Sequence, residues 1–298
     1  MVRQYKIHTN LDGTDDKVWD VTNGKVRFYQ PSNLGLQSTN NIWQSNGIGV
    51  MGTRSITQPQ IEFKLETFGE SLEENYRLMK DFINDILNQK FVTLEYQTEI
   101  FQVYADLALA DVTKTEGYGK NGTFSEKITF DIITKWYTYE NLTFDMVQNG
   151  KVISGKSKIY GGTAPGYYEY VKGTSYTYYG ETNIERLSRW DIKDEIFSFM
   201  GILYPKLPKT PTGVRFLDDI GNEYTAIVFK TEQVQDYILI NTDVNDETYQ
   251  GWKGTTALNL FPVMDFERYR TRIIEKGQME LINLSKAEFK IKRKADFV

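Results

Sequence analysis

The sequence predicts a mainly β protein of two domains, an α+β domain followed by a β-sandwich. At 298 residues, the chain exceeds the ~100–200 residues that are usual for one domain. Its 20 tyrosines and 17 phenylalanines suit pleated, half-buried surfaces. Short alternating apolar segments are separated by turn residues along most of the chain, and one well-marked helix interrupts them.

The first elements of the chain are a strand, a long polar stretch and a second strand. Residues 25–29 alternate after an Asn23-Gly24 turn, and residues 61–65 alternate again. Between them, residues 31–60 are rich in Ser, Asn, Gln and Gly, which predicts a long loop. A structureless loop of that length is unusual in a compact domain, so we expect it to be functional or to be ordered by a partner.

The helix follows and has a clear start. Ser71 and Glu74 have the spacing of a capping box. Apolar side chains then recur at helical spacing: Leu72, Tyr76, Met79, Ile83 and Ile86. Strands are predicted at residues 91–96 and 100–107, and another follows an Asn121-Gly122 turn. Residues 1–135 are therefore predicted to form a sheet with one helix across it.

The composition changes near Trp136. Residues 155–180 are rich in Gly and Tyr and poor in large aliphatic residues, so they cannot build a core of their own and should protrude. Tyrosine is enriched at protein interfaces because it offers a large contact area and a polar group. We therefore predict a contact surface made of Tyr160, Tyr167, Tyr168, Tyr170, Tyr176, Tyr178 and Tyr179. The alternative is a flexible loop in which these tyrosines are incidental.

From about residue 189 the chain again has many short strands separated by turn residues, which predicts a β-sandwich. The basic run near the C-terminus, Lys286 to Lys294, alternates with apolar residues and is predicted to be a strand with a charged, solvated face. The predicted strands are Gly213–Leu217, Thr225–Phe229, Tyr237–Asn241, Thr256–Phe261, Thr271–Ile274, Gln278–Leu284 and Lys286–Arg293.

The composition also argues against several classes of function. A net charge of −5 disfavours nucleic acid as the main partner, because phosphate binding needs a dense basic surface. The absence of cysteine excludes disulfides, thiolate nucleophiles and cysteine–zinc sites, and it fits assembly inside a cell. The first ten residues lack the apolar core of a signal peptide, and no stretch has the ~18 apolar residues of a membrane span. We expect no membrane contact.

No catalytic or metal-binding motif is apparent. His8 is the only histidine and is predicted to be a surface residue. Residues 47–52 have GxGxxG spacing but lack the preceding apolar strand, and no helix is predicted after them. Residues 243–247 begin like a calcium loop, but Thr248 replaces the required glycine, so a hairpin turn is predicted. We predict no catalytic residue, metal or cofactor, although a glycosidase needs only two carboxylates and no motif.

The order of features resembles the distal tail protein (Dit) family of siphophages, closest to the version in lactococcal phages. The likeness covers essentially the whole chain and rests on loose, strand-shaped patterns: Trp136-Tyr137, residues 236–243, residues 258–263 and the final stretch through Gly277 and Leu281. It implies that residues 1–135 form a ring-forming, hexamerisation domain. Residues 136–298 would be a galectin-like sandwich, with an arm inserted at about 145–188.

The resemblance also implies a function. Family members form a hexameric hub in the baseplate that joins the tail tube, built of major tail protein, to the tail-tip protein and anchors receptor-binding proteins for host adsorption. DNA would only pass through the central channel. The chain would be assembled in the host cytoplasm and located in the virion. The arm tyrosines would hold the receptor-binding protein, and the neighbouring subunit would order residues 31–60, with Trp43, Ile48, Val50 and Met51 at the ring interface.

Two alternatives from other classes stay open. A carbohydrate-binding module for host cell-wall saccharide would need an exposed aromatic platform, for which Trp252 and Tyr249 are the candidates. The galectin sugar site includes a histidine, and His8 cannot supply it, so that set of residues cannot form; Trp252 would otherwise pack in or beside the sandwich. A cell-wall hydrolase would need a convergent acid pair in a cleft.

Overall fold

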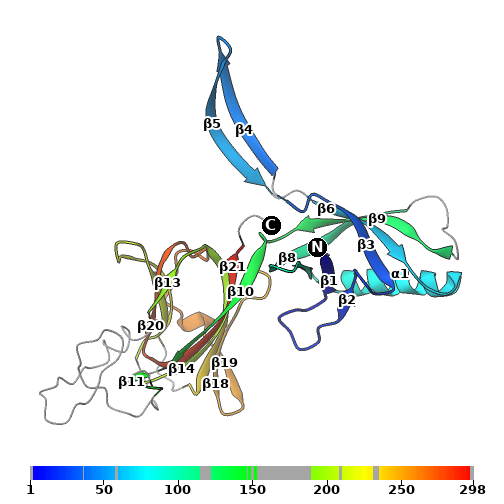
Figure 1. Cartoon of the computed structure of the whole chain (residues 1–298). Helices are drawn as coiled ribbons and strands as arrows, with labels where there is room; N and C mark the ends of the chain where they lie inside the picture. The colour runs from blue at the N-terminus through cyan, green and yellow to red at the C-terminus, as the bar shows by residue number, and fades with distance from the viewer. Residues whose placement is uncertain are drawn as a thin grey trace, which may run out of the picture. The chain divides into compact units, whose positions relative to one another are not determined.

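The computed structural model describes residues 3–35, 37–57, 60–114, 122–145, 147–148, 151–152, 189–207, 210–230 and 235–295. They belong to two compact units (Figure 1): Met1–Thr138 with Ala295–Val298, and Tyr139–Lys294. The chain passes from the first unit to the second within strand β10 (Tyr137–Asp145), a few residues after the predicted boundary at 135. The mainly β fold class is confirmed, with a single α-helix in the described part of the chain.

The first unit is built on an antiparallel sheet with the order β2-β1-β7-β8-β9-β6-β3. The Phe28 N–H donates to the carbonyl of Val21, just beyond β2, so the sheet curls until its two ends meet. The strands are β1 (Gln4–His8), β2 (Val18–Asp20), β3 (Val26–Ser32), β6 (Ile61–Thr67), β7 (Val92–Gln97), β8 (Gln102–Thr113) and β9 (Ser125–Ile132).

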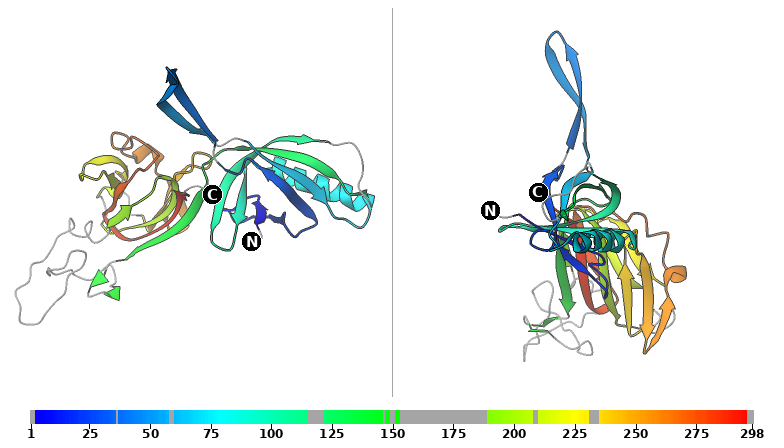
Figure 2. Two further views of the ribbon diagram at one scale, coloured as in Figure 1. Left: turned by 45° about the horizontal axis from the view of Figure 1, so that its top comes forward. Right: turned by 90° about the vertical axis from the view of Figure 1, so that its right-hand side faces the viewer.

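Helix α1 (Leu72–Leu87) lies against this sheet, as predicted (Figure 2). The Ser71 hydroxyl accepts a hydrogen bond from the Glu74 N–H at 3.2 Å, which is the N-terminal half of the expected capping box. The helix buries Phe82 and Ile86 in the core of the unit, where Phe28 stacks on Phe63 with ring centroids 4.6 Å apart.

The second unit is a sandwich of two antiparallel sheets. One has the order β19-β18-β17-β14-β21-β10 and the other β13-β20-β15-β16. Between them lies an apolar core that includes Phe199, Phe216 and Phe289. The remaining strands are β13 (Arg189–Ile192), β14 (Ile196–Pro205), β15 (Thr212–Leu217), β16 (Glu223–Phe229), β17 (Tyr237–Asn241), β18 (Thr248–Lys253), β19 (Thr256–Asn259), β20 (Gly277–Ile282) and β21 (Leu284–Lys294), with β11 (Val147–Gln148) and β12 (Lys151–Val152) as a separate short pair.

The prediction of a long loop over residues 31–60 is wrong. Strands β4 (Gln37–Ser45) and β5 (Ile48–Thr57) pair with each other as a hairpin. The turn residues Asn46 and Gly47 have φ angles of 50° and 79°, both in the left-handed region that a type I′ turn requires. Asn-Gly is the strongest short hairpin signal, and it outweighs the polar composition around it.

Two predicted strands also need correction. Residues 271–274 do not form a strand, and only an isolated bridge joins Ile274 to Ile196. The Thr225 hydroxyl bonds both the N–H and the carbonyl of Thr271, in place of the backbone partners that a strand would provide. The strand expected to end at Phe261 ends at Asn259, whose side chain accepts from the Phe261 N–H at 3.0 Å and opens the short 3-10 helix η2 (Phe261–Val263).

Candidate assembly surfaces

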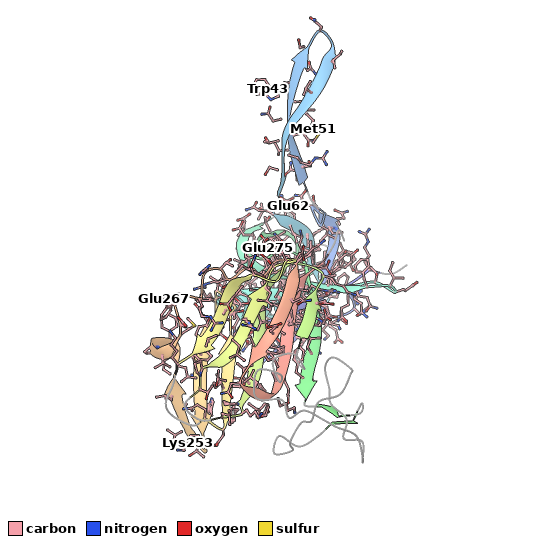
Figure 3. The ribbon with its side chains drawn as sticks, turned by 90° about the vertical axis from the view of Figure 1, so that its left-hand side faces the viewer. Trp43, Met51, Glu62, Lys253, Glu267 and Glu275 are labelled. Atoms are coloured by element: carbon pink, nitrogen blue, oxygen red, sulfur yellow. The ribbon has the colours of Figure 1, made fainter. Side chains whose placement is uncertain are left out.

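The β4–β5 hairpin forms a sheet of its own and is fully exposed along β4 (Figures 1 and 3). All four residues that the sequence predicted for a ring interface lie on it. The exposed fractions are 67% for Trp43, 69% for Ile48, 61% for Val50 and 49% for Met51. A fifth apolar residue, Ile42, is 54% exposed and was not among the predicted residues.

The register divides these five side chains between the two faces of the hairpin. Trp43 is paired with Val50, and Ser45 with Ile48, so Trp43, Ile48 and Val50 share one face. Ile42 is paired with Met51, so these two residues lie on the opposite face. We call the first set face A and the second set face B. The four predicted residues therefore do not form one patch.

A hairpin with apolar side chains on both faces is unfavourable in water. A two-stranded ribbon alone is marginally stable at best, and it has no second layer to cover either face. Exposed apolar patches of this kind mark interaction surfaces in soluble proteins. Its side-chain hydrogen bonds include one from Arg54 Nε to Asn40 Oδ1 at 3.0 Å. Both faces of the hairpin therefore carry apolar side chains that are exposed in the single chain.

The predicted arm surface lies outside the described residues. This holds for the whole set: Tyr160, Tyr167, Tyr168, Tyr170, Tyr176, Tyr178 and Tyr179. The structure adds no geometry to that prediction.

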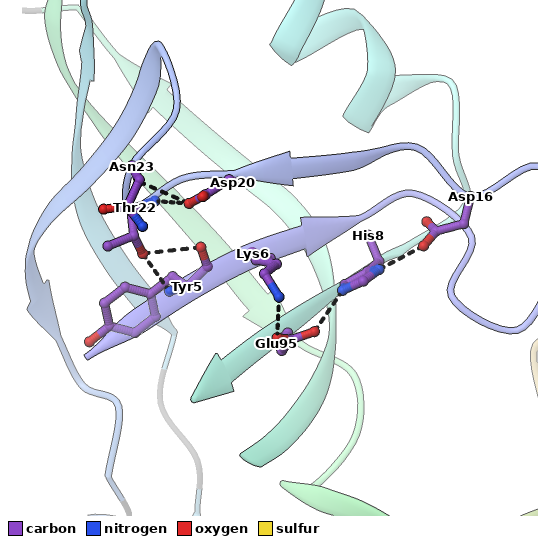
Figure 4. Close-up of polar contacts among 8 residues, drawn as sticks. All are labelled: Tyr5, Lys6, His8, Asp16, Asp20, Thr22, Asn23 and Glu95. Atoms are coloured by element: carbon purple, nitrogen blue, oxygen red, sulfur yellow. Dashed lines mark hydrogen bonds and ion pairs between the residues drawn. The ribbon is translucent and has the colours of Figure 1, made fainter. Parts of the chain in front are cut away.

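His8 is not a surface residue, contrary to the prediction (Figure 4). It lies on β1 with 7% of its surface exposed. Its Nδ1 is 2.6 Å from Asp16 Oδ2, and its Nε2 is 3.0 Å from Glu95 Oε2. Lys6 Nζ donates to the other oxygen of Glu95 at 2.8 Å. The histidine therefore joins the loop after β1 to strand β7.

The environment of Glu95 sets its charge. Burial by itself would raise the pKa of Glu95, but the hydrogen bonds and charges of Lys6 and His8 outweigh burial, and the pKa lies below its ordinary value of 4.5. The carboxylate therefore stays ionised and bound to both partners at neutral pH.

The two aromatic residues proposed as a sugar platform have different positions. Tyr249 is 3% exposed and belongs to the sandwich core, so its role as an exposed platform is wrong. Burial and hydrogen bonds to Tyr269 and Glu247 raise the pKa of Tyr249. Trp252 is half-buried beside the sandwich and stacks on Tyr237, with ring centroids 6.1 Å apart and planes 12° apart.

The acidic segment at residues 243–247 forms the hairpin turn between β17 and β18, as predicted. The Asp243 carboxylate is occupied, because Oδ1 accepts from the Asn245 N–H at 3.0 Å and Oδ2 bonds Lys292 Nζ at 2.9 Å. No group of three or more potential metal-ligating side chains occurs in the described ranges. Within the same ranges, no helix is both long and apolar enough to cross a membrane.

Family models match both halves of the chain. The N-terminal domain of distal tail protein matches residues 4–133, and the Dit C-terminal domain matches residues 135–298. The chain belongs to the distal tail protein family. Two curated members, from Lactococcus phage p2 and Lactococcus phage SK1, are 95% and 91% identical to it over 298 residues, the whole of both chains.

Solved structures agree with the family assignment. A chain of the phage p2 baseplate, in its activated conformation with Ca, is 95% identical, covers 100% of both chains and gives a TM-score of 0.80. The Dit protein of phage SPP1 is only 10% identical and gives a TM-score of 0.54 over 99% of this chain, which shows a shared fold and no more. As a distal tail protein, the chain is a structural component of the phage virion and not an enzyme.

Proposed function

We propose that this distal tail protein closes into a hexameric ring through its β4–β5 hairpin. The ring is the baseplate hub that joins the tail tube to the tail-tip protein. Residues 145–188, with their tyrosines, hold the receptor-binding proteins, and DNA only passes through the centre. The observation that carries the ring is the hairpin itself, which has apolar side chains on both faces that no other described part of the chain covers.

The chemistry of the hairpin suits a contact between copies of one chain. A closed ring uses a head-to-tail contact, in which each subunit offers one surface and receives another. Trp43 at the centre of face A is the type of residue that dominates interface energies when it enters a pocket. A slender hairpin with two apolar faces also fits between two surfaces, so one face is free for the neighbouring subunit and the other for a second component.

Partners other than the chain itself follow from the family. The p2 relative was solved as part of the phage p2 baseplate. The hub proposal assigns the ring to the first unit and the receptor-binding contact to the insertion in the second. These two assignments are separable, because they use different parts of the chain.

The test is the mass of the purified protein by light scattering. A ring predicts about six times the 34.6 kDa mass of the single chain. Replacing residues 37–57 by a short Gly-Ser link should give the single-chain mass. Deleting Gly161 to Gly180 should leave the ring mass unchanged and abolish capture of receptor-binding protein. A single-chain mass for the intact protein at high concentration, with tail partners present, would refute the ring, and unchanged capture would refute the arm.

A further inference from the structure

We infer that the outer face of the second unit's six-stranded sheet is a binding site for a short, neutral, hydroxyl-rich saccharide. The inference does not depend on the ring. It starts from strand alternation. Ile238 and Ile240 of β17 are 0% and 2% exposed and lie in the core. Tyr237, which precedes them, and Leu239, which lies between them, therefore point outward. The same alternation places Tyr204 of β14 and Trp252 of β18 on the outer face.

Three aromatic rings form a row across neighbouring strands on this face. Trp252 is paired with Tyr237 and stacks on it. Tyr237 lies beside Tyr204, with ring centroids 6.5 Å apart. The row ends at Lys286, whose Nζ lies 5.5 Å from the centroid of the Tyr204 ring. All three rings are half-buried, so they are fixed by neighbours and still offer part of each ring to a ligand.

A groove lies next to this row on the same strands. None of the three rings lines it, but Ile202 and Leu239, each two residues from a ring along its strand, do. Its volume is about 540 Å³, within the usual range for small-molecule sites. The floor of the groove is apolar and is made by Met200, Ile202 and Leu239. None of the residues that line the groove comes from the opposite sheet, so the groove lies on the outer face. From the aromatic row to Met200 is four residues along β14, or about 13 Å. That length suits a short oligosaccharide.

The rim of the groove carries both donors and acceptors. Asn141, Asn241, Asp246, Glu288 and Lys290 line it. Several are held in place: Asn241 Nδ2 donates to Asp246 Oδ2 at 3.2 Å, and Lys290 Nζ lies 4.0 Å from the centroid of the Tyr139 ring. Planar amides and carboxylates together with an ammonium group match hydroxyls, which both donate and accept.

The arrangement disfavours other ligand classes. The lining holds one ammonium group, Lys290, against two carboxylates, Asp246 and Glu288, so it lacks the cluster of cations that a phosphate group needs, even though Glu288 is paired with Lys286. An extended peptide cannot add to the sheet here, because β17, β14 and β21 are paired on both sides and have no free edge. A purely apolar ligand would leave the polar rim without hydrogen bonds. A sugar satisfies both halves of the site, because its C–H face covers aromatic and aliphatic groups while its hydroxyls meet the rim.

The test uses the full-length protein and trisaccharides of glucose and of N-acetylglucosamine, titrated to millimolar concentration by calorimetry and ligand-observed NMR. We expect binding of at least one trisaccharide. Trp252→Ala and Glu288→Gln should each weaken that binding by at least about tenfold. The matched control, Tyr224→Ala, removes a half-buried ring on β16 of the opposite sheet and should leave binding unchanged. Thermal melts confirm that each variant is folded.

Two outcomes would overturn the inference. One is no saccharide binding by the intact protein, and the other is equal binding by the protein and its groove variants. A third result would also reject the sugar site: no saccharide binds, and the groove variants no longer bind a baseplate protein. The face would then be a protein-docking surface. Measuring the ring mass in the same samples separates this result from any failure of the hub proposal.

Discussion

Face A of the β4–β5 hairpin gives the sharpest test of how the ring is held together. The double variant Trp43→Ser, Val50→Ser removes two of its three apolar side chains, which are 67% and 61% exposed in the single chain. Burying the exposed part of a tryptophan of this kind contributes about 2.5–4 kcal/mol to the free energy of association, and burying the exposed part of a valine contributes about 1–2 kcal/mol. If a neighbour covers half of that surface, the variant loses about 2–3 kcal/mol per interface.

A loss of this size weakens each contact by about 30–140-fold. Light scattering over a dilution series should therefore show the variant breaking into smaller species at concentrations where the parent protein keeps its ring. At a dilution where both proteins are single chains, the melting temperature should not change, because both side chains are mostly exposed in the single chain. The face B variant, Ile42→Ser with Met51→Ser, should have a smaller effect, since neither residue is a tryptophan. The control Ile100→Ser removes a 78% exposed apolar residue elsewhere in the first unit and should have none.

The reasoning would be refuted if the face A variant kept its ring at every dilution at which the parent does. It would also fail if Ile100→Ser weakened the ring equally, because the effect would then come from general loss of apolar surface and not from the hairpin.

Three further predictions concern stability and the hairpin turn. His8→Ala should lower the free energy of unfolding by about 1–3 kcal/mol in a urea titration, because buried Glu95 loses a donor. Because the folded-state pKa of Glu95 is lowered, its contribution to the free energy of unfolding should be present above about pH 4.5 and be lost as the pH falls below that value. In His8→Ala, the free energy of unfolding should depend less on pH in this acidic range. Gly201→Val should lower the melting temperature, because even a Cβ would lie 2.9 Å from the Phe289 ring, at a cost of about 1–3 kcal/mol. Gly47→Val should strain the turn, where φ is 79°, and weaken the ring in light scattering, while the melting temperature of the single chain at high dilution stays unchanged.

Local rules explain where the prediction from sequence succeeded. The capping pair Ser71 and Glu74 and the apolar spacing after it depend only on residues within one or two turns, and α1 begins and ends as they indicate. Strand alternation likewise placed β17 at Tyr237–Asn241 without error. In each case the signal and the structure lie within the same few residues.

Long-range contacts explain where it failed. His8 is buried by Glu95, which lies 87 residues away, so no local pattern marks it as a core residue. Residues 271–274 were expected to be a strand from their composition, but the Thr225 hydroxyl, 46 residues away, takes their backbone hydrogen bonds. Tyr249 and Trp252 looked equivalent, and only the pairing of β17 with β18 shows that one faces the core and the other the solvent.

By itself, the sequence determined the β-rich class and helix α1, because alternation, helical spacing and turn residues act over short distances, and the order of its motifs identified the family by resemblance. Only the tertiary structure showed that Trp43 and Met51 lie on opposite faces of one hairpin, and that rings from β14, β17 and β18 form one row. Those facts depend on register and on which strands become neighbours. The Asn46-Gly47 turn sets the register of the hairpin, whereas the burial of side chains that are far apart in the chain decides which strands of the sandwich become neighbours.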